Sequence, residues 1–283
     1  MPISRTLPLP CIQIAGVHDL EEALLLHAAG VHAVGLPLRL PVNAEDLTEA
    51  QAAALVHQLP QGIIPVGITY IDNAAEAADF CHTLGIHHLQ LHGPISQHEL
   101  ATLRRLMPHI CILKSLVVRP AHTFGHSATA SLTATASSPT DAAPASSPSA
   151  TATASLTATA SSPTDAATAT TTPADNRATL LHEVQTYAPL VDAFITDTFN
   201  PATGASGATG MTHDWAASRA LVEHSPRPVI LAGGLNPGNV YDAIRAVGPA
   251  GVDAHTGVEG PDGRKSPTLV EQFVREALRG FAI

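Results

Sequence analysis

Two short glycine turns near the C-terminal end of the chain have the composition of a phosphate-binding site. The sequence LAGGL occupies residues 231–235, and HTGVE occupies residues 255–259. Glycine allows backbone N–H groups to approach an anion closely, and a helix that follows the turn adds the positive end of its dipole. The predicted phosphate-binding residues are Gly233, Gly234, Thr256 and Gly257. The alternative is that these glycines serve only to form tight turns.

Three side chains have the chemistry of acid–base catalysts. Asp197 interrupts the apolar run 191–199, where a carboxylate is costly unless it is paired or functional. His92 lies in the sequence LQLHG at residues 89–93, and His255 begins the second glycine turn. Imidazole titrates near neutral pH and can act as a general base. Asp197, His92 and His255 are the predicted catalytic residues. The alternatives are a structural salt bridge for Asp197 and hydrogen-bonded support for His92.

One basic residue and one glycine-rich segment could contact other parts of a ligand. Lys114 lies in the apolar run 111–119, where it could meet an anion or pair with a carboxylate. The sequence GASGATG at residues 204–210 follows Asp197 closely and could close over a bound ligand, which would exclude water. Lys114, Gly207 and Gly210 are therefore predicted substrate-binding residues.

These candidate residues belong to a chain in which short apolar runs alternate with amphipathic segments. Strands are predicted over residues 11–16, 33–38, 64–70, 87–93, 111–119, 191–199, 228–235 and 251–259. Helices are predicted over residues 19–29, 49–59, 73–85, 96–107, 177–187, 213–224, 237–247 and 267–281. Gly30, Gly85 and Gly248 stand where left-handed helix caps are expected. Asn236 and Pro237 indicate an N-cap followed by proline in the first turn of a helix.

Strands and helices in strict alternation predict an α/β fold with a parallel sheet. At this length the closed (β/α)8 TIM barrel is its natural form. The alternative is an open doubly wound sheet, which usually carries a GxGxxG turn after its first strand. The sequence AGVH at residues 15–18 does not match that turn. In a barrel the chemistry lies at the carboxyl ends of the strands, where the candidate residues fall.

A segment rich in Ala, Ser, Thr and Pro interrupts the alternation between the fifth strand and the fifth helix. The sequence ATASLTATASSPTDAA occurs at residues 128–143 and again, unchanged, at residues 152–167. A segment so poor in large apolar residues cannot bury enough surface to offset the entropy of ordering it. We expect residues 121–175 to be a disordered low-complexity insertion within a single barrel domain of residues 1–283.

Composition limits the partners and the compartment. The chain has 14 basic and 24 acidic residues, for a net charge of −10, so no nucleic-acid-binding surface is expected. No apolar run reaches the roughly 18 residues of a membrane span, and the N-terminus does not have the pattern of a signal peptide. The three cysteines, Cys11, Cys81 and Cys111, form no CxxC pair, which argues against a zinc site or a disulfide framework. A cytoplasmic protein without a bound metal is expected.

Together these motifs resemble the phosphoribosylanthranilate isomerase family. The resemblance rests on LQLHG at 89–93, Asp197 with GASGATG at 204–210, HDW at 213–215, LAGGL at 231–235 and GVDAHTGVE at 251–259. It implies a TIM barrel that isomerises N-(5′-phosphoribosyl)anthranilate in tryptophan biosynthesis, by an Amadori rearrangement that needs no cofactor and no metal. It also implies that Asp197 is the acid that opens the ribose ring. The expected partner is a small phosphorylated substrate, bound by a monomer or a homodimer.

Two positions depart from the family pattern. The first strand of the family ends K-I-C-G, where the cysteine is the base, and here QIAG at residues 13–16 places Ala15 at that position. Cys11 lies roughly 13 Å away along the strand, which is beyond the reach of proton transfer. The family arginine that holds the anthranilate carboxylate aligns with Glu45, although Arg39 could reach the ligand from the same loop as a substrate-binding residue.

Three functions remain open from the sequence. The first is a phosphoribosylanthranilate isomerase in which another residue, such as His92 or His255, replaces the cysteine as base. The second is a barrel that keeps the phosphate site and acts on a different phosphorylated sugar or amine. The third is a non-catalytic protein that binds a phosphorylated ligand.

Overall fold

The computed structural model describes residues 6–41, 45–118, 173–198 and 215–282 of the chain. Most of the predicted insertion, residues 121–175, therefore lies outside the described residues. The predicted boundary after the insertion needs a correction. Helix α5 (Pro173–Tyr187) begins at Pro173, ahead of its predicted start at Arg177 and inside the segment assigned to the insertion.

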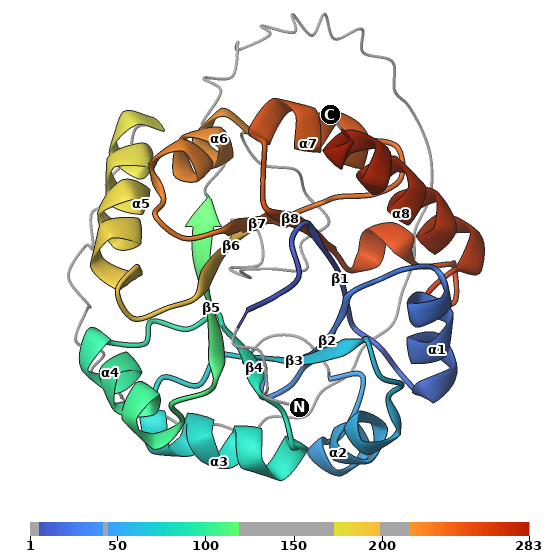
Figure 1. The fold of residues 1–283 in the computed structure, drawn as a ribbon, viewed down its shortest axis with the longest axis horizontal. Coiled ribbons are helices and arrows are strands. Elements are labelled where there is room, and N and C mark those ends of the chain that lie inside the picture. Colours follow the sequence, from blue (N-terminus) through green and yellow to red (C-terminus); the bar gives the residue numbers. More distant parts are fainter. Residues whose placement is uncertain (1–5, 42–44, 119–172, 199–214, 283) are drawn as a thin grey trace, which may run out of the picture. The chain divides into compact units, whose positions relative to one another are not determined.

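Parallel strands close into a barrel in which each strand pairs with its neighbours in the sequence and β8 pairs with β1 (Figure 1). The strands are β1 (Cys11–Ala15), β2 (Ala33–Pro37), β3 (Ile64–Thr69), β4 (His88–Leu91), β5 (Cys111–Val118), β6 (Ala193–Thr198), β7 (Val229–Leu231) and β8 (Gly251–Ala254). The predicted (β/α)8 barrel is confirmed. The pairing of β1 with β8 rules out an open doubly wound sheet, which would leave two free edges.

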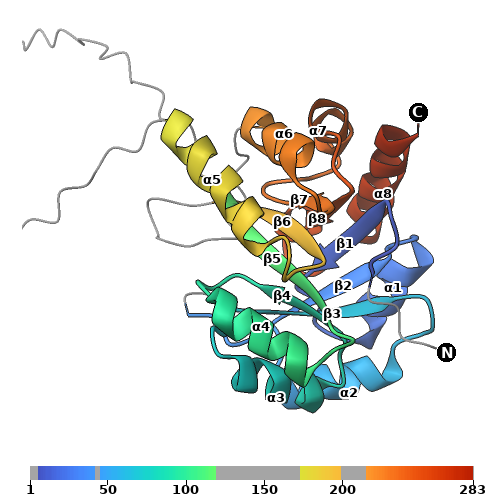
Figure 2. The ribbon, with the colours of Figure 1, turned by 60° about the vertical axis from the view of Figure 1, so that its left-hand side comes forward.

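An α-helix follows each strand and packs along the outside of the barrel (Figures 1 and 2). Besides α5, the helices are α1 (Leu20–Ala28), α2 (Glu49–Gln58), α3 (Ala74–Leu84), α4 (Gln97–Leu106), α6 (Trp215–His224), α7 (Val240–Val247) and α8 (Pro267–Phe281). A short 3₁₀ helix, η1 (Thr256–Val258), lies between β8 and α8. None of the helices that the structure describes is both long and apolar enough to span a membrane.

Local signals in the sequence set several helix ends. Thr48 and Gln51 form a capping box at the start of α2, in which each side chain bonds the backbone N–H of the other residue. Gly85 and Gly248 end α3 and α7 in the left-handed conformation, with φ of 71° and 68°. Gly30 follows the end of α1 with φ of 91°. The three predicted glycine caps are confirmed.

The predicted helix start at Asn236 is wrong. Asn236 and Pro237 belong to a turn, and α7 begins only at Val240. Asn236 Oδ1 accepts a hydrogen bond of 2.8 Å from the backbone N–H of Gly238, and Asn236 N donates to Asn239 Oδ1 at 2.8 Å. The bond from Gly238 resembles that of an N-cap side chain, but residues 237–239 form a turn before α7 begins.

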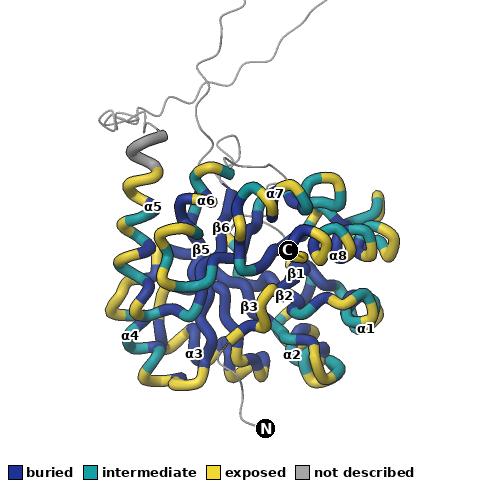
Figure 3. Tube along the Cα trace, turned by 45° about the horizontal axis from the view of Figure 1, so that its top comes forward, coloured by how far each residue is buried: buried dark blue, intermediate teal, exposed yellow. Residues whose placement is uncertain are grey.

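Apolar side chains pack in two layers, one on each side of the strands. The strands accordingly form the buried centre of the fold (Figure 3). The larger layer fills the space between strands and helices and includes Phe80, Phe194 and Phe273. The smaller layer fills the barrel itself, with members such as Ala15, Ala33, Val66, Ile68, Leu113, Ile195 and Ile230. Alternation along each strand directs a set of buried polar residues to the same inner face, namely Gln13, His88, Gln90, Ser115, Asp197 and Asp253. The inside of the barrel is therefore partly polar.

Candidate active site

Asp197 and His92 meet at the carboxyl ends of β6 and β4. His92 Nδ1 lies 2.8 Å from Asp197 Oδ2, and the two side chains are only 9% and 5% exposed. Asp197 Oδ1 accepts a hydrogen bond of 2.8 Å from the backbone N–H of Thr198, and Ser115 Oγ lies 3.4 Å from Oδ2. The structure thus brings together two of the predicted catalytic residues and holds the carboxyl group of Asp197 in one orientation.

A chain of hydrogen bonds continues from His92 across the inside of the barrel. Gln90 Nε2 lies 2.6 Å from His92 Nε2, and Gln13 Nε2 donates to Gln90 Oε1 at 2.9 Å. Both ring nitrogens of His92 are engaged, so His92 has no free nitrogen with which to take a proton from a substrate. Gln13 and Gln90 are not among the residues predicted from the sequence. The sequence feature that could have identified them is a polar residue between apolar neighbours in a strand predicted to be buried.

Asp253 of β8 lies at the other end of this chain. It pairs in register with Gln13 of β1, whose side chain is within hydrogen-bonding reach of its carboxyl group. Burial raises the pKa of Asp253 to about 7, and the charge of Asp197 adds to the rise, whereas Gln13 and Lys265 oppose it. Asp253 Oδ1 and Gln13 Oε1 are both buried without a hydrogen-bond partner among the described residues. Asp253 is a functional candidate that the sequence analysis did not single out.

His255 follows β8, and its ring rests against Gly16 at the end of β1. A Cβ atom on Gly16 would lie 2.0 Å from His255 Nε2, and φ of Gly16 is 73°, so only glycine fits there. The ring therefore stands beside the end of β1, next to the residue that follows Ala15. Burial lowers the pKa of His255, and the neighbouring Lys265 lowers it further, so the ring is neutral at pH 7.

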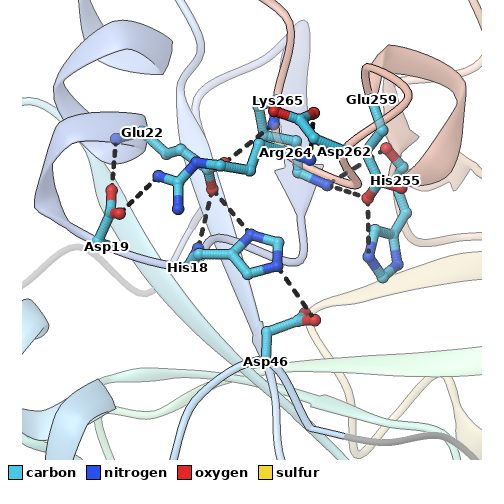
Figure 4. A network of polar contacts seen from close by, with 9 residues as sticks. All are labelled: His18, Asp19, Glu22, Asp46, His255, Glu259, Asp262, Arg264 and Lys265. Carbon is cyan, nitrogen blue, oxygen red and sulfur yellow. Dashed lines mark hydrogen bonds and ion pairs between the residues drawn. The ribbon is translucent and has the colours of Figure 1, made fainter.

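A carboxylate and a buried ammonium group support His255 (Figure 4). Glu259 Oε1 lies 3.4 Å from His255 Nε2 and 2.6 Å from Lys265 Nζ. The Lys265 side chain is fully buried, and Nζ lies 3.4 Å from the backbone oxygen of His255. A carboxylate that faces one ring nitrogen favours the tautomer with its proton on that nitrogen.

Further polar contacts join three loops around the barrel mouth (Figure 4). His18, between β1 and α1, has Nδ1 3.1 Å from Glu22 Oε2 and Nε2 3.5 Å from Asp46 Oδ1 of the loop before α2. Arg264 Nε, between β8 and α8, lies 3.3 Å from Glu22 Oε1. These contacts link the loops that follow β1, β2 and β8, which are the loops that surround His255.

The two glycine turns lie against each other. Gly233 and Gly234 follow β7 with φ of 108° and 62°, values that residues other than glycine rarely adopt. The Asn239 side chain holds this turn, because its Nδ2 donates to the carbonyl oxygen of Gly234 at 3.0 Å. A Cβ atom on Gly257 would lie only 1.9 Å from the carbonyl oxygen of Leu235. Only glycine fits at this contact, which places the two turns side by side.

The turns also present backbone N–H groups that could bind an anion. Within the part of the chain that the structure describes, the N–H groups of Gly233 and Gly234 have no hydrogen-bond partner. Thr256 and Gly257 open η1, and the first N–H groups of a helix have no partner inside it. All four residues predicted to bind phosphate are thus close together at the carboxyl ends of β7 and β8.

Lys114 points away from the barrel interior, contrary to the prediction from the sequence. Arg39 follows β2 at the barrel mouth, where its side chain pairs with two carboxylates, and its contact with a substrate stays a prediction. The Arg39 guanidinium forms ion pairs with Glu49 of α2, at 2.6 Å, and with Glu76 of α3, at 2.9 Å. Lys114 lies on the outer face of β5, where its Nζ is 5.8 Å from the centre of the Tyr187 ring of α5. Both cations are held by the surrounding helices. The predicted substrate-binding residues Gly207 and Gly210 lie outside the described residues.

Cys11 does not provide a second thiol base. Its side chain is fully buried inside the barrel. Burial raises the pKa of Cys11 to about 12, and the charge of Asp253 contributes to the rise. The thiol therefore stays protonated at neutral pH. This agrees with the distance of Cys11 from Ala15 along the strand, which already argued against Cys11 as the base.

Sequence comparisons identify relatives of this barrel. A family model described as N-(5'phosphoribosyl)anthranilate (PRA) isomerase matches residues 155–276. The N-(5'-phosphoribosyl)anthranilate isomerase 2 of Methanosarcina mazei is 30% identical over 271 residues, which cover 95% of this chain and 95% of the relative. The N-(5'-phosphoribosyl)anthranilate isomerase of Halobacterium salinarum is 49% identical over 94 residues, which cover 32% of this chain and 42% of the relative.

Solved structures agree with the fold. The N-(5'-phosphoribosyl)anthranilate isomerase of Pyrococcus furiosus matches with a TM-score of 0.64 at 22% identity, covering 95% of this chain and 98% of that one. The phosphoribosyl anthranilate isomerase of Thermotoga maritima matches with a TM-score of 0.65 at 20% identity and the same coverage. Carboxyl and imidazole groups at the carboxyl ends of the strands define the chain as a (β/α)8-barrel enzyme. It belongs to the N-(5′-phosphoribosyl)anthranilate isomerase family, as its similarity to the M. mazei relative over nearly the whole chain shows.

Proposed function

We propose that this chain isomerises N-(5′-phosphoribosyl)anthranilate in tryptophan biosynthesis, with Asp197 as the general acid. The observation that carries the proposal is the Asp197 carboxyl group, buried at the carboxyl end of β6 and oriented by His92 and the N–H of Thr198. Its proton goes to the ribose ring oxygen while the bond from that oxygen to C1′ breaks, and the bonding electrons stay on the oxygen. This step leaves a positively charged double bond between C1′ and the nitrogen.

The second step needs a base beside C2′, and His255 is the residue best placed for it. The family pattern has its cysteine at the position of Ala15, and the His255 ring rests against the next residue, Gly16. The neutral imidazole takes the C2′ proton, the C–H electrons form the bond between C1′ and C2′, and the nitrogen regains its electron pair. Loss of the 2′-hydroxyl proton and addition of a proton to C1′ then give the ketone.

Glu259 and Lys265 fit this assignment of His255. When His255 accepts a proton, the carboxylate of Glu259, 3.4 Å from Nε2, stabilises the imidazolium that forms. Before the step, the burial of the ring and the nearby Lys265 keep the pKa of His255 low, so the ring is ready to accept a proton at neutral pH. His92 orients the acid instead, because both of its ring nitrogens are already engaged.

The two glycine turns are the proposed site for the 5′-phosphate. Gly233 and Gly234 present N–H groups from one turn, and Thr256 and Gly257 from the other. A phosphate bound there lies at the carboxyl ends of β7 and β8, beside His255, which begins the second turn. Family membership favours this isomerase over a barrel for a different phosphorylated compound or a non-catalytic binding protein.

Two measurements test the activity. The full chain is expected to restore growth without tryptophan to a bacterial strain that lacks the isomerase, and the purified protein is expected to convert phosphoribosylanthranilate in vitro. Failure of the wild-type protein in both assays would contradict the proposed function, whatever the identity of the base.

A paired set of variants tests the base. His255→Asn is expected to lower kcat by about 10²–10⁴-fold, the usual contribution of a general base. Ala15→Cys is expected to change the wild-type rate little but to recover part of the activity in the His255→Asn background. A His255→Asn protein with wild-type turnover would rule out His255 as the base.

Oligomeric state and compartment remain predictions. We expect a monomer or a homodimer in the cytoplasm, with a small phosphorylated molecule as the substrate. A solved relative, the isomerase of T. maritima, is described as dimeric. Light scattering on the purified chain would decide between the two oligomeric states.

A further inference from the structure

We propose that the ring of Tyr70 binds the aromatic ring of the substrate at the barrel mouth, and so selects a phosphorylated sugar that carries an aryl amine on C1′. The proposal rests on the proposed isomerase activity, because it names the residue that recognises the anthranilate half of the substrate. Two observations carry it. Tyr70 follows β3, across the barrel from the glycine turns, and its ring contacts the ring of His92.

The Tyr70 side chain points towards the inside of the barrel. Val66 and Ile68 of β3 belong to the apolar layer inside the barrel, and Tyr70 continues their alternation one residue past the end of the strand. The centres of the Tyr70 and His92 rings are 5.5 Å apart, with an angle of 37° between the rings. Burial and the nearby charge of Asp197 raise the pKa of Tyr70 to about 12. The ring of Tyr70 therefore lies beside the pair formed by His92 and Asp197.

The backbone of Tyr70 is held against the end of β4. A Cβ atom on Gly93 would lie 2.5 Å from the carbonyl oxygen of Tyr70, so only glycine allows the two segments to approach this closely. The backbone N–H of His92 also donates to the carbonyl oxygen of Thr69 at 2.9 Å. Because these contacts fix the backbone on both sides of the residue, the ring of Tyr70 needs little further ordering when a ligand binds.

The order of the strands places Tyr70 opposite the proposed phosphate site. In a closed ring of eight strands, β3 and β4 lie across the barrel from β7 and β8 (Figure 1). A 5′-phosphate bound at the glycine turns holds C5′ beside β7 and β8, while Asp197 of β6 meets the ribose ring oxygen. C1′ is bonded to that oxygen on the side away from C5′. The nitrogen on C1′ and its aryl group therefore extend away from the phosphate, towards β3 and β4.

An aromatic side chain suits the group that reaches this side of the mouth. Aromatic rings attract each other in offset or tilted arrangements, with centres about 4.5–7 Å apart. Tyr70 is only partly buried, so part of its surface remains accessible, while His92 supports the ring from the side of β4. A phenol with a pKa of about 12 stays neutral at the pH of the reaction, so Tyr70 does not repel the carboxylate of anthranilate.

This assignment distinguishes between two classes of phosphorylated sugar. A compound with an aryl amine on C1 contacts the glycine turns through its phosphate and Tyr70 through its ring. Ribulose 5-phosphate contacts the glycine turns but has no ring to place against Tyr70. The aryl compound is therefore expected to bind more tightly, and Tyr70 is expected to account for part of the difference.

Calorimetry on the full chain with two stable ligands tests the proposal. The first ligand, reduced 1-(o-carboxyphenylamino)-1-deoxyribulose 5-phosphate, carries the aromatic ring, and the second, ribulose 5-phosphate, does not. Tyr70→Leu is expected to weaken the binding of the first ligand by about 2- to 12-fold, the usual contribution of one aromatic contact, and to leave the second unchanged. Tyr70→Phe keeps the ring and should bind both ligands as the wild type does.

A matched control removes the same side chain elsewhere. Tyr241 of α7 packs against the guanidinium of Arg279, on the outside of the barrel, and Tyr241→Leu should leave the affinity for both ligands unchanged. Three results would overturn the proposal: equal affinity of the wild type for the two ligands, unchanged binding of the aryl ligand in Tyr70→Leu, or an equal loss in Tyr70→Phe and Tyr70→Leu. The last result would assign the contact to the hydroxyl group.

Kinetics separate a contact with the substrate from an effect through His92. If Tyr70 binds the aromatic ring, Tyr70→Leu raises KM and changes kcat little. If Tyr70 only supports His92, Tyr70→Leu lowers kcat and leaves the binding of the aryl ligand intact, which would contradict the proposal. The calorimetric result does not depend on turnover. A protein that binds the aryl ligand through Tyr70 but does not isomerise phosphoribosylanthranilate would therefore contradict the proposed function alone.

Discussion

His92 Nδ1 and Asp197 Oδ2 lie 2.8 Å apart, although 105 positions separate the two residues in the sequence. They lie at the carboxyl ends of β4 and β6, which are not neighbours in the barrel. The two side chains meet because both point inward at the carboxyl ends of their strands, where a barrel brings distant residues together. The orientation of the proposed acid thus depends on a residue from a different part of the chain.

Replacement of Asp197 by a residue without an acidic proton should lower turnover without weakening ligand binding. Asp197→Asn keeps the size of the side chain, and we expect kcat to fall by about 10²–10⁴-fold. The affinity for a stable product analogue, measured by calorimetry, should change little because the glycine turns are untouched. Asp242→Asn on the exposed side of α7 is the control and should leave both quantities unchanged. Turnover at the wild-type rate in Asp197→Asn would exclude Asp197 as the acid.

Loss of the His92 ring should lower turnover through the orientation of Asp197. A hydrogen bond to a charged group is worth about 1.5–3 kcal/mol, so His92→Ala should lower kcat by roughly 10- to 100-fold with a small change in KM. His92→Asn can place an amide N–H near the position of Nδ1, and it should recover part of the loss. A change in KM alone, with kcat unaffected, would show that His92 binds the substrate and does not orient the acid.

Substitution in the first glycine turn should weaken phosphate binding. Gly234→Val places a branched side chain at φ of 62°. The control, Gly248→Val, does the same at φ of 68°, and a Cβ atom at position 248 would have no other atom within 4 Å. Both changes should destabilise the fold by about 1–2 kcal/mol. Only Gly234→Val should also weaken the binding of inorganic phosphate and raise KM. Equal phosphate affinity in the two variants, measured by calorimetry, would remove this turn from the proposed site.

The low-complexity insertion should be dispensable for the barrel. Replacement of residues 123–171 by a short Gly/Ser linker keeps α5 from its start at Pro173. The free energy of loop closure changes by only about 0.6 kcal/mol for each doubling of loop length, so the thermal midpoint should stay the same or rise by a few degrees. Circular dichroism and a thermal scan would measure this. Insoluble or unfolded protein after the replacement would show that the insertion contributes to folding.

A buried histidine should make the barrel sensitive to acid. Burial lowers the pKa of His88 from 6.5 to about 4, with His87 adding to the shift and Asp192 opposing it. The unfolded chain therefore binds the proton more tightly, so stability is complete above pH 6.5 and falls as the pH decreases from 6.5 to 4. At about 1.36 kcal/mol per unit, the loss is about 3 kcal/mol.

Urea unfolding of variants at pH 7 and pH 4.5 tests this assignment. His88→Leu should reduce the difference in unfolding free energy between the two pH values, because its side chain cannot be protonated. His87→Gln, at the exposed neighbouring position, should leave most of that difference in place. An unchanged pH dependence in His88→Leu would mean that other groups cause the acid sensitivity.

The sequence by itself determines the architecture and the location of the chemistry. Alternation of apolar runs and amphipathic segments is a local property, and it predicts the strands, the helices and the closed barrel. Gly85 and Gly248 mark helix ends because only their own backbone conformation is needed for the cap. Asp197 and the glycine turns are recognisable because an acid in a buried strand and paired glycines are unusual in any fold.

Only the tertiary structure decides which polar side chains meet. A barrel strand is buried on both faces, so its sequence does not show which face is inward. The sequence therefore predicts Lys114 at the barrel mouth, whereas in the structure Lys114 faces Tyr187. The sequence also predicts that Arg39 binds the ligand, whereas in the structure Arg39 forms ion pairs with Glu49 and Glu76. The link of Gln13 with Gln90, and the contact of His255 with Gly16, join residues far apart in the sequence. Such contacts depend on strand register and closure of the barrel, which fix the distances that proton transfer requires.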